Sequence, residues 1–283
     1  MADEGYIELE HGRVWYRRSG SGDAKPILLL HGGPGAAAYY LEPLEERLAE
    51  HRPVVVYDQL GCGRSDQPDD PSLWTLDYFT GEVDAMREAL GLDECHLLGQ
   101  SWGGWLSIEY LCRGTTGIDR VVLASTSANI GVFSENCRRL MAELPEPHGD
   151  VLLAGDLDDP RYPAAEHAFY MRHVCRLDPW PECMAKTGES LDGNQVYTTM
   201  NGPNEFTVVG SLRDWSRDAD LHRIDRPTLI TYGGHDELGE PCAMGIKAGI
   251  PHAEVRCFAD SAHVPHIEEA DAYAETVEAF LRA

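Results

Sequence analysis

Short apolar runs alternate with amphipathic stretches in the first half of the chain. The runs are rich in Val, Ile or Leu and stop at turn-forming residues; they cover residues 27–30, 54–57, 96–98 and 121–124. Such runs predict parallel strands that are buried on both faces. The spacing of apolar residues between them predicts helices over residues 40–49 and 75–90. Strands that alternate with helices indicate a mostly parallel sheet covered by helices on both faces.

The alternation is interrupted from about residue 128 to about residue 223. This segment contains many prolines and charged residues and no clear series of strands, which predicts a helical insertion. Strand-like runs return at residues 227–232 and 253–258, and residues 267–281 predict a closing amphipathic helix. We therefore expect a core formed by residues 1–127 and 224–283 and a helical cap domain formed by residues 128–223.

The charge and hydropathy of the chain exclude several kinds of partner. The formal net charge is −25 and the pI is about 4.7, so nucleic acid, which binds basic surfaces, is not an expected partner. No apolar stretch reaches the roughly 18 residues that a membrane span needs. The acidic N-terminus has no apolar core behind it, so we expect no signal peptide and no membrane partner.

The cysteines give no sign of a disulfide framework or a metal site. All eight are scattered, without a C-x-x-C pair, which favours reduced thiols and a cytoplasmic location. No group of His and Cys has zinc-site spacing, so we expect neither a metal nor a cofactor. Cys62 lies near the predicted site, where we expect an inert small residue rather than a reactive thiol.

The segment Gly99-x-Ser101-x-Gly103 lies between a predicted buried strand and a predicted apolar helix. This is the context of a nucleophile elbow, in which a sharp turn raises a serine hydroxyl above the sheet and glycines leave room for the backbone. Ser101 is therefore the predicted nucleophile. The backbone N–H of Trp102, at the start of the helix, is a predicted donor to the oxyanion. The alternative is a glycine-rich helix start without chemistry.

A serine hydroxyl needs a base, and in this type of enzyme a carboxylate and then a histidine follow the serine along the chain. His263, in a turn after the last predicted strand, is preferred over His266, which falls at the start of the closing helix. Asp236 follows the preceding strand and is preferred over Asp260, which shares a turn with His263. Histidines in polar stretches, among them His173, are expected at the surface.

The developing oxyanion needs a second, preorganised donor. The loop at residues 31–35, which follows the first buried strand, is rich in glycine and is the natural source of this donor. We prefer the backbone N–H of Gly33. Loss of one such donor typically raises the barrier by about 3 kcal/mol. The alternative for this loop is a plain Gly/Pro turn.

Further motifs extend from the first buried strand to the closing helix. They read LLLHGGPG (28–35), YDQLGCGRSD (57–66), LLGQSWGGWLSIEYL (97–111), MNGPNEF (200–206), GGHDE (233–237) and DSAHVPHIEEADAY (260–273). Together they resemble the proline iminopeptidase family of α/β-hydrolases, which includes the tricorn-interacting aminopeptidase and related amino acid amidases. The resemblance implies an α/β-hydrolase core with an inserted helical cap, in agreement with the break near residue 128.

The resemblance also implies that carboxylates hold the free α-amino group of the substrate. The matching residues are Glu205, in MNGPNEF, and Glu237, beside the predicted triad acid. Together with Asp236 they would place like charges in one partly dry pocket, where a substrate ammonium relieves the repulsion. The predicted enzyme removes one N-terminal residue, proline or a small apolar amino acid, from short peptides or aminoacyl amides through an acyl-enzyme. The alternatives are a solvated cap glutamate for Glu205 and a helix-start charge for Glu237.

Other functions stay open at this point. The same fold carries esterases and other acyl hydrolases, amide hydrolases that remove an aminoacyl group from a specialised metabolite, and ligand receptors without turnover. Trp102 and Phe206 are the candidates for an apolar slot that accepts a proline ring. The sequence leaves the preferred N-terminal residue and the oligomeric state undetermined.

Overall fold

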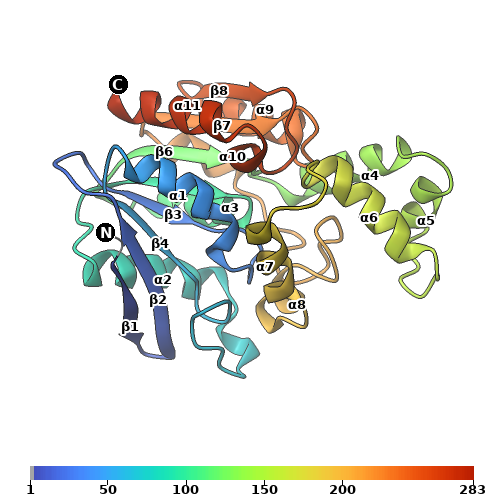
Figure 1. Ribbon diagram of the computed structural model, residues 1–283, viewed down its shortest axis with the longest axis horizontal. Helices are drawn as coiled ribbons and strands as arrows, with labels where there is room; N and C mark the ends of the chain where they lie inside the picture. The colour runs from blue at the N-terminus through green and yellow to red at the C-terminus, as the bar shows by residue number, and fades with distance from the viewer. Residues whose placement is uncertain (1–2) are drawn as a thin grey trace.

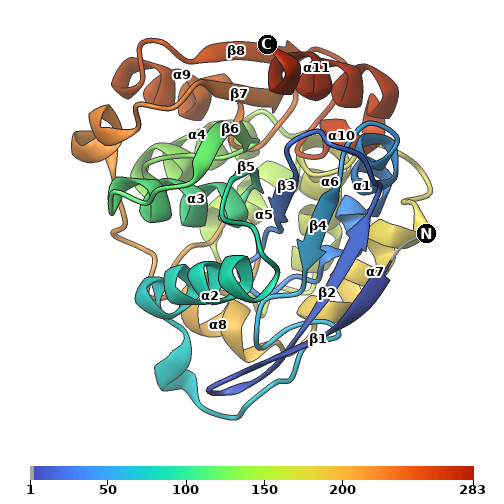
Figure 2. The same ribbon diagram turned by 90° about the vertical axis from the view of Figure 1, so that its left-hand side faces the viewer.

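The computed structural model describes residues 3–283, which contain an eight-stranded sheet with the strand order β1-β2-β4-β3-β5-β6-β7-β8 (Figures 1 and 2). Strand β2 runs antiparallel to both of its neighbours, and β3 to β8 run parallel to one another. The strands are β1 (Asp3–Leu9), β2 (Gly12–Ser19), β3 (Ile27–Leu30), β4 (Val54–Tyr57), β5 (Cys95–Gln100), β6 (Ile118–Ala124), β7 (Thr228–Gly233) and β8 (Glu254–Phe258).

The predicted mostly parallel sheet is confirmed, and each predicted strand is present. The hairpin of β1 and β2 was not predicted from the sequence. The side chains of β1 are exposed or half-buried, so this edge strand lacks the continuous apolar run that marks the central strands.

Side chains of the central strands point alternately into two apolar layers, as the pleat of a sheet requires. In β3, Leu28 and Leu30 pack into one layer, and Ile27 and Leu29 pack into the other. The first layer contains α2 (Leu76–Ala89), α3 (Trp102–Cys112) and α9 (Gly239–Gly249), whereas the second contains α1 (Glu42–Ala49) and α11 (Ala270–Arg282). Figure 2 shows these two groups of helices on opposite faces of the sheet.

Two of the predicted helices are divided in the structure. The predicted helix over residues 40–49 consists of the 3-10 helix η1 (Ala38–Leu41) and α1, which begins where Pro43 occupies its first turn. The closing helix is preceded by the separate short helix α10 (Pro265–Glu268). Helix α2 matches its prediction, because the Thr75 hydroxyl accepts a hydrogen bond from the backbone N–H of Tyr78 and caps the helix (3.1 Å).

Between β6 and β7 the described chain forms helices and no named strand. In Figure 1, α4, α5 and α6 extend away from the sheet, and α7 and α8 lie closer to it. Helix α7 is tied to the loop before η1, because the backbone N–H of Ala37 donates to the Ser190 hydroxyl (3.0 Å). The division into a core and a cap domain stays a prediction. The helices between β6 and β7 are α4 (Ile130–Ala142), α5 (His148–Ala154), α6 (Tyr162–His173), α7 (Glu182–Leu191), α8 (Gln195–Met200) and the 3-10 helix η3 (Asp218–Arg223). The 3-10 helix η2 (Pro71–Leu73) lies between β4 and α2.

No helix within residues 3–283 is both long enough and apolar enough to span a membrane.

Candidate active site

Ser101 occupies a sharp turn between β5 and α3. Its φ of 55° and ψ of −122° are unfavourable for a residue with a side chain, which is typical of a strained functional turn. The turn is held by a hydrogen bond from the backbone N–H of Ser101 to the carbonyl of Ala124 (2.9 Å). A side chain at Gly103 would place Cβ 2.1 Å from the carbonyl oxygen of Leu30, so only glycine allows α3 to approach β3 this closely.

The structure brings His263 and Asp236 together, from loops that follow β8 and β7. The Nδ1 of His263 lies 2.9 Å from Oδ1 of Asp236, and the same oxygen accepts a hydrogen bond from the backbone N–H of Leu238 (3.0 Å). His263 and Ser101 line one cavity. The rivals lie elsewhere: Asp260 is exposed, and His266 is buried outside the cavity lining, with its ring close to those of Tyr40 and Tyr273.

Electrostatics around His263 favour its charged form. Burial alone lowers the pKa of the imidazole, but the Asp236 carboxylate and then Glu237 and Glu205 outweigh this effect and raise the pKa to about 9. Because Asp236 occupies Nδ1, Nε2 is the ring nitrogen left for exchange of a proton. Extra negative charge near His263 therefore makes it a stronger base.

Gln100, the residue before Ser101, contacts His263 directly. Its side-chain Nε2 lies 3.1 Å from the backbone carbonyl oxygen of His263 and 3.2 Å from His263 Nε2. The Gln100 Oε1 accepts a hydrogen bond from the Tyr40 hydroxyl, which in turn accepts one from the backbone N–H of Gly32 (2.7 Å). This buried chain of hydrogen bonds links the histidine to the glycine-rich loop. Sequence reasoning missed it, although Gln100 stands inside the elbow motif.

The two predicted oxyanion donors are the backbone N–H groups of Gly33 and Trp102. Gly33 has a φ of +112° and lines the cavity. The backbone N–H of Trp102 belongs to the first turn of α3, where a helix offers no acceptor of its own. The loop of Gly33 is fixed from behind by His31, whose Nδ1 contacts the carbonyl of Gly32 (2.9 Å) and whose Nε2 accepts from the backbone N–H of Gln59 (2.9 Å).

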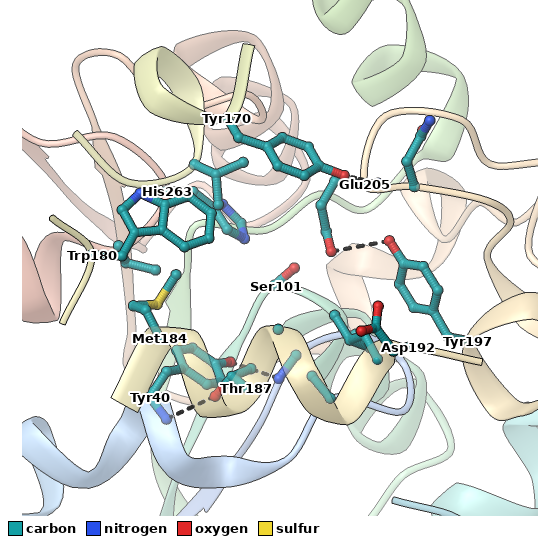
Figure 3. A pocket seen from close by; sticks show the side chains of 18 of the residues that line it. Tyr40, Ser101, Tyr170, Trp180, Met184, Thr187, Asp192, Tyr197, Glu205 and His263 are labelled. Atoms are coloured by element: carbon teal, nitrogen blue, oxygen red, sulfur yellow. Dashed lines mark hydrogen bonds between the residues drawn. The ribbon is translucent and has the colours of Figure 1, made fainter. Parts of the chain in front are cut away.

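Glu205 reaches the cavity from the loop that follows α8. Its Oε1 accepts a hydrogen bond from the Tyr197 hydroxyl (3.0 Å), and its backbone N–H donates to the hydroxyl of Tyr170 (3.4 Å). In Figure 3 the carboxylate of Glu205 points toward Ser101. Loss of hydration raises the pKa of Glu205, while the neighbouring His263 and the Tyr197 hydroxyl act in the opposite direction.

Glu237 is buried and does not belong to the cavity lining. It is 1% exposed, and neither carboxylate oxygen has a hydrogen-bond partner among the described residues. Burial raises the pKa of Glu237 well above its usual range, the charge of His263 partly counteracts this, and Glu205 and Asp236 raise it further. An unpartnered buried carboxyl is costly, so this group needs either a proton or a nearby cation.

The apolar part of the cavity differs from the prediction. Trp102 is fully buried, with its indole N–H donating to Gln59 Oε1 (2.8 Å), and neither Trp102 nor Phe206 lines the cavity. Both are large aromatic side chains that fill the core instead. The cavity has a volume of about 360 Å³. Its apolar lining comes from α6, α7 and neighbouring loops and consists of Tyr170, Val174, Trp180, Met184 and Val264. The sequence offers one signal for this apolar lining, because Trp180 is an isolated aromatic residue between two prolines.

Two other predicted residues have clear surroundings. Cys62 is fully buried, its thiol contacts the carbonyl of Gln59 (3.0 Å), and burial raises its pKa well above the usual range, so the thiol is unreactive. His173 was expected at the surface, which is wrong: it is buried and its Nδ1 contacts the carbonyl of His235 (2.8 Å). Within residues 3–283 no group of His, Cys, Asp and Glu has the arrangement of a metal site.

The whole chain is similar to known hydrolases. Residues 25–270 match the family described as the alpha/beta hydrolase fold. The chain is 35% identical to the proline iminopeptidase of Heyndrickxia coagulans, and the similarity covers 100% of both chains. The chain belongs to the proline iminopeptidase family of α/β hydrolases. As a member of this family it is a serine hydrolase, and the fold class predicted from the sequence is confirmed.

Solved structures agree with this membership. The structure of VinJ superimposes with a TM-score of 0.94 at 36% identity, covering 99% of this chain and 98% of VinJ. The proline iminopeptidase of Mycobacterium smegmatis superimposes with a TM-score of 0.93 at 33% identity, with the same coverage of 99% and 98%. The family relationship therefore includes the helical segment between β6 and β7 as well as the sheet.

Proposed function

We propose that this enzyme removes a single N-terminal residue, proline or a small apolar amino acid, from short peptides or aminoacyl amides. The observation that carries the proposal is the position of Glu205, whose carboxylate lines the same cavity as Ser101 and points toward it. A carboxylate at this place binds the substrate ammonium, and because it shares the cavity with Ser101 it limits cleavage to the first peptide bond. The relatives named proline iminopeptidase support an N-terminal proline as the preferred residue.

The proposed catalytic residues are Ser101, Asp236 and His263. His263 takes the proton of the Ser101 hydroxyl as its oxygen attacks the carbonyl carbon, and Asp236 stabilises the resulting imidazolium. The backbone N–H groups of Gly33 and Trp102 donate to the oxyanion of the tetrahedral intermediate. The intermediate collapses with cleavage of the C–N bond, and the leaving amine takes the proton from His263. A water molecule then hydrolyses the ester on Ser101 by the same steps.

Glu205 and Glu237 are the proposed partners of the substrate amine. Glu205 touches the ammonium directly, and Glu237 acts from behind the cavity wall through its charge. Residues 128–223 form the proposed cap, which narrows the cavity and admits chain ends rather than folded proteins. No metal or other cofactor takes part in this mechanism. We also propose a cytoplasmic location, which the eight free cysteines support.

A matched pair of substrates tests the proposal. Prolyl p-nitroanilide and its N-acetyl derivative differ at the amine alone, and p-nitroaniline release is measured for both. Because a lost charged hydrogen bond costs about 1.5–3 kcal/mol, acetylation should lower kcat/KM by about 10- to 100-fold. Equal rates would contradict the amine site and favour an esterase or another acyl hydrolase of the same fold. A panel of other aminoacyl anilides then ranks the N-terminal residues and, with acylated specialised metabolites, separates peptide from metabolite substrates.

A further inference from the structure

The cavity has two chemically different halves, which lie on opposite sides of Ser101. In Figure 3, Glu205 and Tyr197 lie on one side, and Trp180 and Met184 lie on the other side together with His263. The same division is seen in the packing. Met184, like Val174 and Val264, belongs to the apolar layer of α1 and α11, and Trp180 packs against this layer; Phe206, next to Glu205, belongs to the opposite layer.

The orientation of the substrate follows from the proposed function, on which this inference rests. The amine of the substrate is at Glu205 and its carbonyl carbon is at Ser101. The leaving nitrogen must then face His263, because this histidine donates the proton that the nitrogen needs. The half of the cavity beside His263 is therefore the half that receives whatever is attached to the leaving nitrogen.

The residues beside His263 form an apolar surface. Val264 is the next residue in the chain, and Val174 is adjacent because its carbonyl accepts a hydrogen bond from the backbone N–H of His263 (3.1 Å). Trp180 has its polar atom occupied, since the indole N–H donates to the carbonyl of Cys175 (3.0 Å), and its ring stacks on Tyr170 with the centroids 6.5 Å apart. Apolar side chains with satisfied polar atoms form a fixed wall for an apolar group.

The charges of the cavity lining disfavour a leaving group that carries a carboxylate. Among the residues that line the cavity in the described chain there is no Lys or Arg, and the acidic members are Glu166, Asp192 and Glu205. His263 is the one cationic side chain available, and Asp236 already holds it (2.9 Å). A carboxylate attached next to the leaving nitrogen therefore enters a negative cavity without a partner, which is unfavourable.

We propose that the apolar half of the cavity, formed by Val174, Trp180, Met184 and Val264, is the binding site for the leaving group, and that the enzyme selects substrates whose leaving amine is apolar and uncharged. A C-terminally blocked amide fits this description. An internal apolar residue of a longer peptide fits as well, because its own carboxyl group is part of the next peptide bond.

Three substrates with the same N-terminal residue test the selection: Pro-Leu-NH₂, Pro-Gly-NH₂ and Pro-Leu with a free carboxylate. Release of proline is measured by chromatography with the unmodified enzyme. We expect kcat/KM for Pro-Leu-NH₂ to exceed that for each of the other two by about tenfold or more. Equal values for Pro-Leu-NH₂ and Pro-Gly-NH₂ would overturn the inference while leaving the proposed function intact. Absence of turnover with all three would refute the proposed function and the inference with it.

Substitutions in the apolar half locate the effect. Trp180→Ala and Met184→Ala should each lower the ratio of kcat/KM for Pro-Leu-NH₂ over Pro-Gly-NH₂ several-fold, about tenfold for the larger truncation. Met244→Ala is the matched control, because Met244 is 46% exposed on α9 and should leave the ratio unchanged. Circular dichroism checks that each variant is folded, and Met184→Ala keeps the test valid if Trp180→Ala does not fold.

A different occupant of the apolar half gives a different result. If this half holds the side chain of the N-terminal residue, Trp180→Ala changes the order of preference among prolyl, alanyl and leucyl anilides, which share one leaving group. The ratio between Pro-Leu-NH₂ and Pro-Gly-NH₂ then stays constant in the variant. That pair of results would overturn the assignment of the leaving group to Trp180 and Met184.

Discussion

The floor of the cavity and its helical wall are built in different ways. The floor comprises Ser101, His263 and the Gly33 loop, which follow strands of the sheet, and Asp236 supports His263 from outside the cavity lining. Ser101 is tied to the sheet by the hydrogen bond from its backbone N–H to the carbonyl of Ala124. The wall comprises residues of α6 to α8 and the loops between them, such as Trp180, which are held mainly by packing. A sheet fixes reacting atoms precisely, whereas a packed helical wall changes its shape with each side chain. In the proposed function, the floor therefore carries out the reaction and the wall selects the substrate.

The largest expected effect comes from the floor. Ser101→Ala removes the attacking oxygen, so kcat for prolyl p-nitroanilide should fall by about 10⁴-fold or more while substrate binding persists. Single-turnover kinetics measures the loss of turnover, and titration with prolinamide measures substrate binding. Retained turnover in this variant would show that another residue forms the acyl-enzyme.

The second largest effect is expected from a residue of the wall. Glu205→Gln keeps the shape of the side chain and removes its charge, so KM for free-amine substrates should rise by about 10- to 100-fold with a smaller change in kcat. Glu189→Gln, an exposed glutamate of α7, is the matched control. An unchanged KM in the Glu205 variant would show that the wall does not bind the amine.

A substitution at Gln100 tests whether the floor depends on the hydrogen bonds that position His263. Gln100→Leu removes the contact with His263 and leaves the Tyr40 hydroxyl without its acceptor, so kcat should fall by about tenfold with little change in KM. A role in stability alone would lower the melting temperature and leave kcat and its pH dependence unaltered. Gln67→Leu, at an exposed position, controls for the substitution itself.

The pH dependence of kcat/KM couples the wall to the floor. His263 must be neutral to act as a base, so activity falls as the pH drops through its pKa, which burial lowers but Asp236, Glu237 and Glu205 raise to about 9. Glu205→Gln removes one of these charges and should move the acidic limb of the profile to lower pH. A limb at the same pH in both enzymes would show that the wall does not influence the base.

Removal of metal ions should leave the activity of the enzyme unchanged. Dialysis against EDTA is expected to leave kcat/KM for prolyl p-nitroanilide unchanged, because the proposed mechanism uses only side chains and backbone N–H groups. If EDTA inactivates the enzyme and added divalent metal restores its activity, the proposed mechanism is contradicted.

The contrast between floor and wall also explains what could be predicted from the sequence. Ser101, Asp236 and His263 stand in turns directly after buried strands, so local motifs and chain order indicated that they would meet at one edge of the sheet. Met184 on α7 and Trp180 in the loop before it reach the cavity through tertiary packing, which no short motif encodes. Trp102, which adjoins Ser101, was a candidate for the apolar slot, but its indole turns into the core.

The buried position of Glu237 has a consequence for the energetics of substrate binding. Burial without a hydrogen-bond partner in the described residues raises the pKa of its carboxyl group, which favours binding of a proton in the free enzyme. An arriving ammonium favours the ionised form, so binding is linked to proton release. Calorimetric titration of prolinamide into Ser101→Ala should therefore give enthalpies that differ between buffers according to their heats of ionisation. Enthalpies that depend on the buffer would show that the enzyme exchanges a proton for the charged end of its substrate.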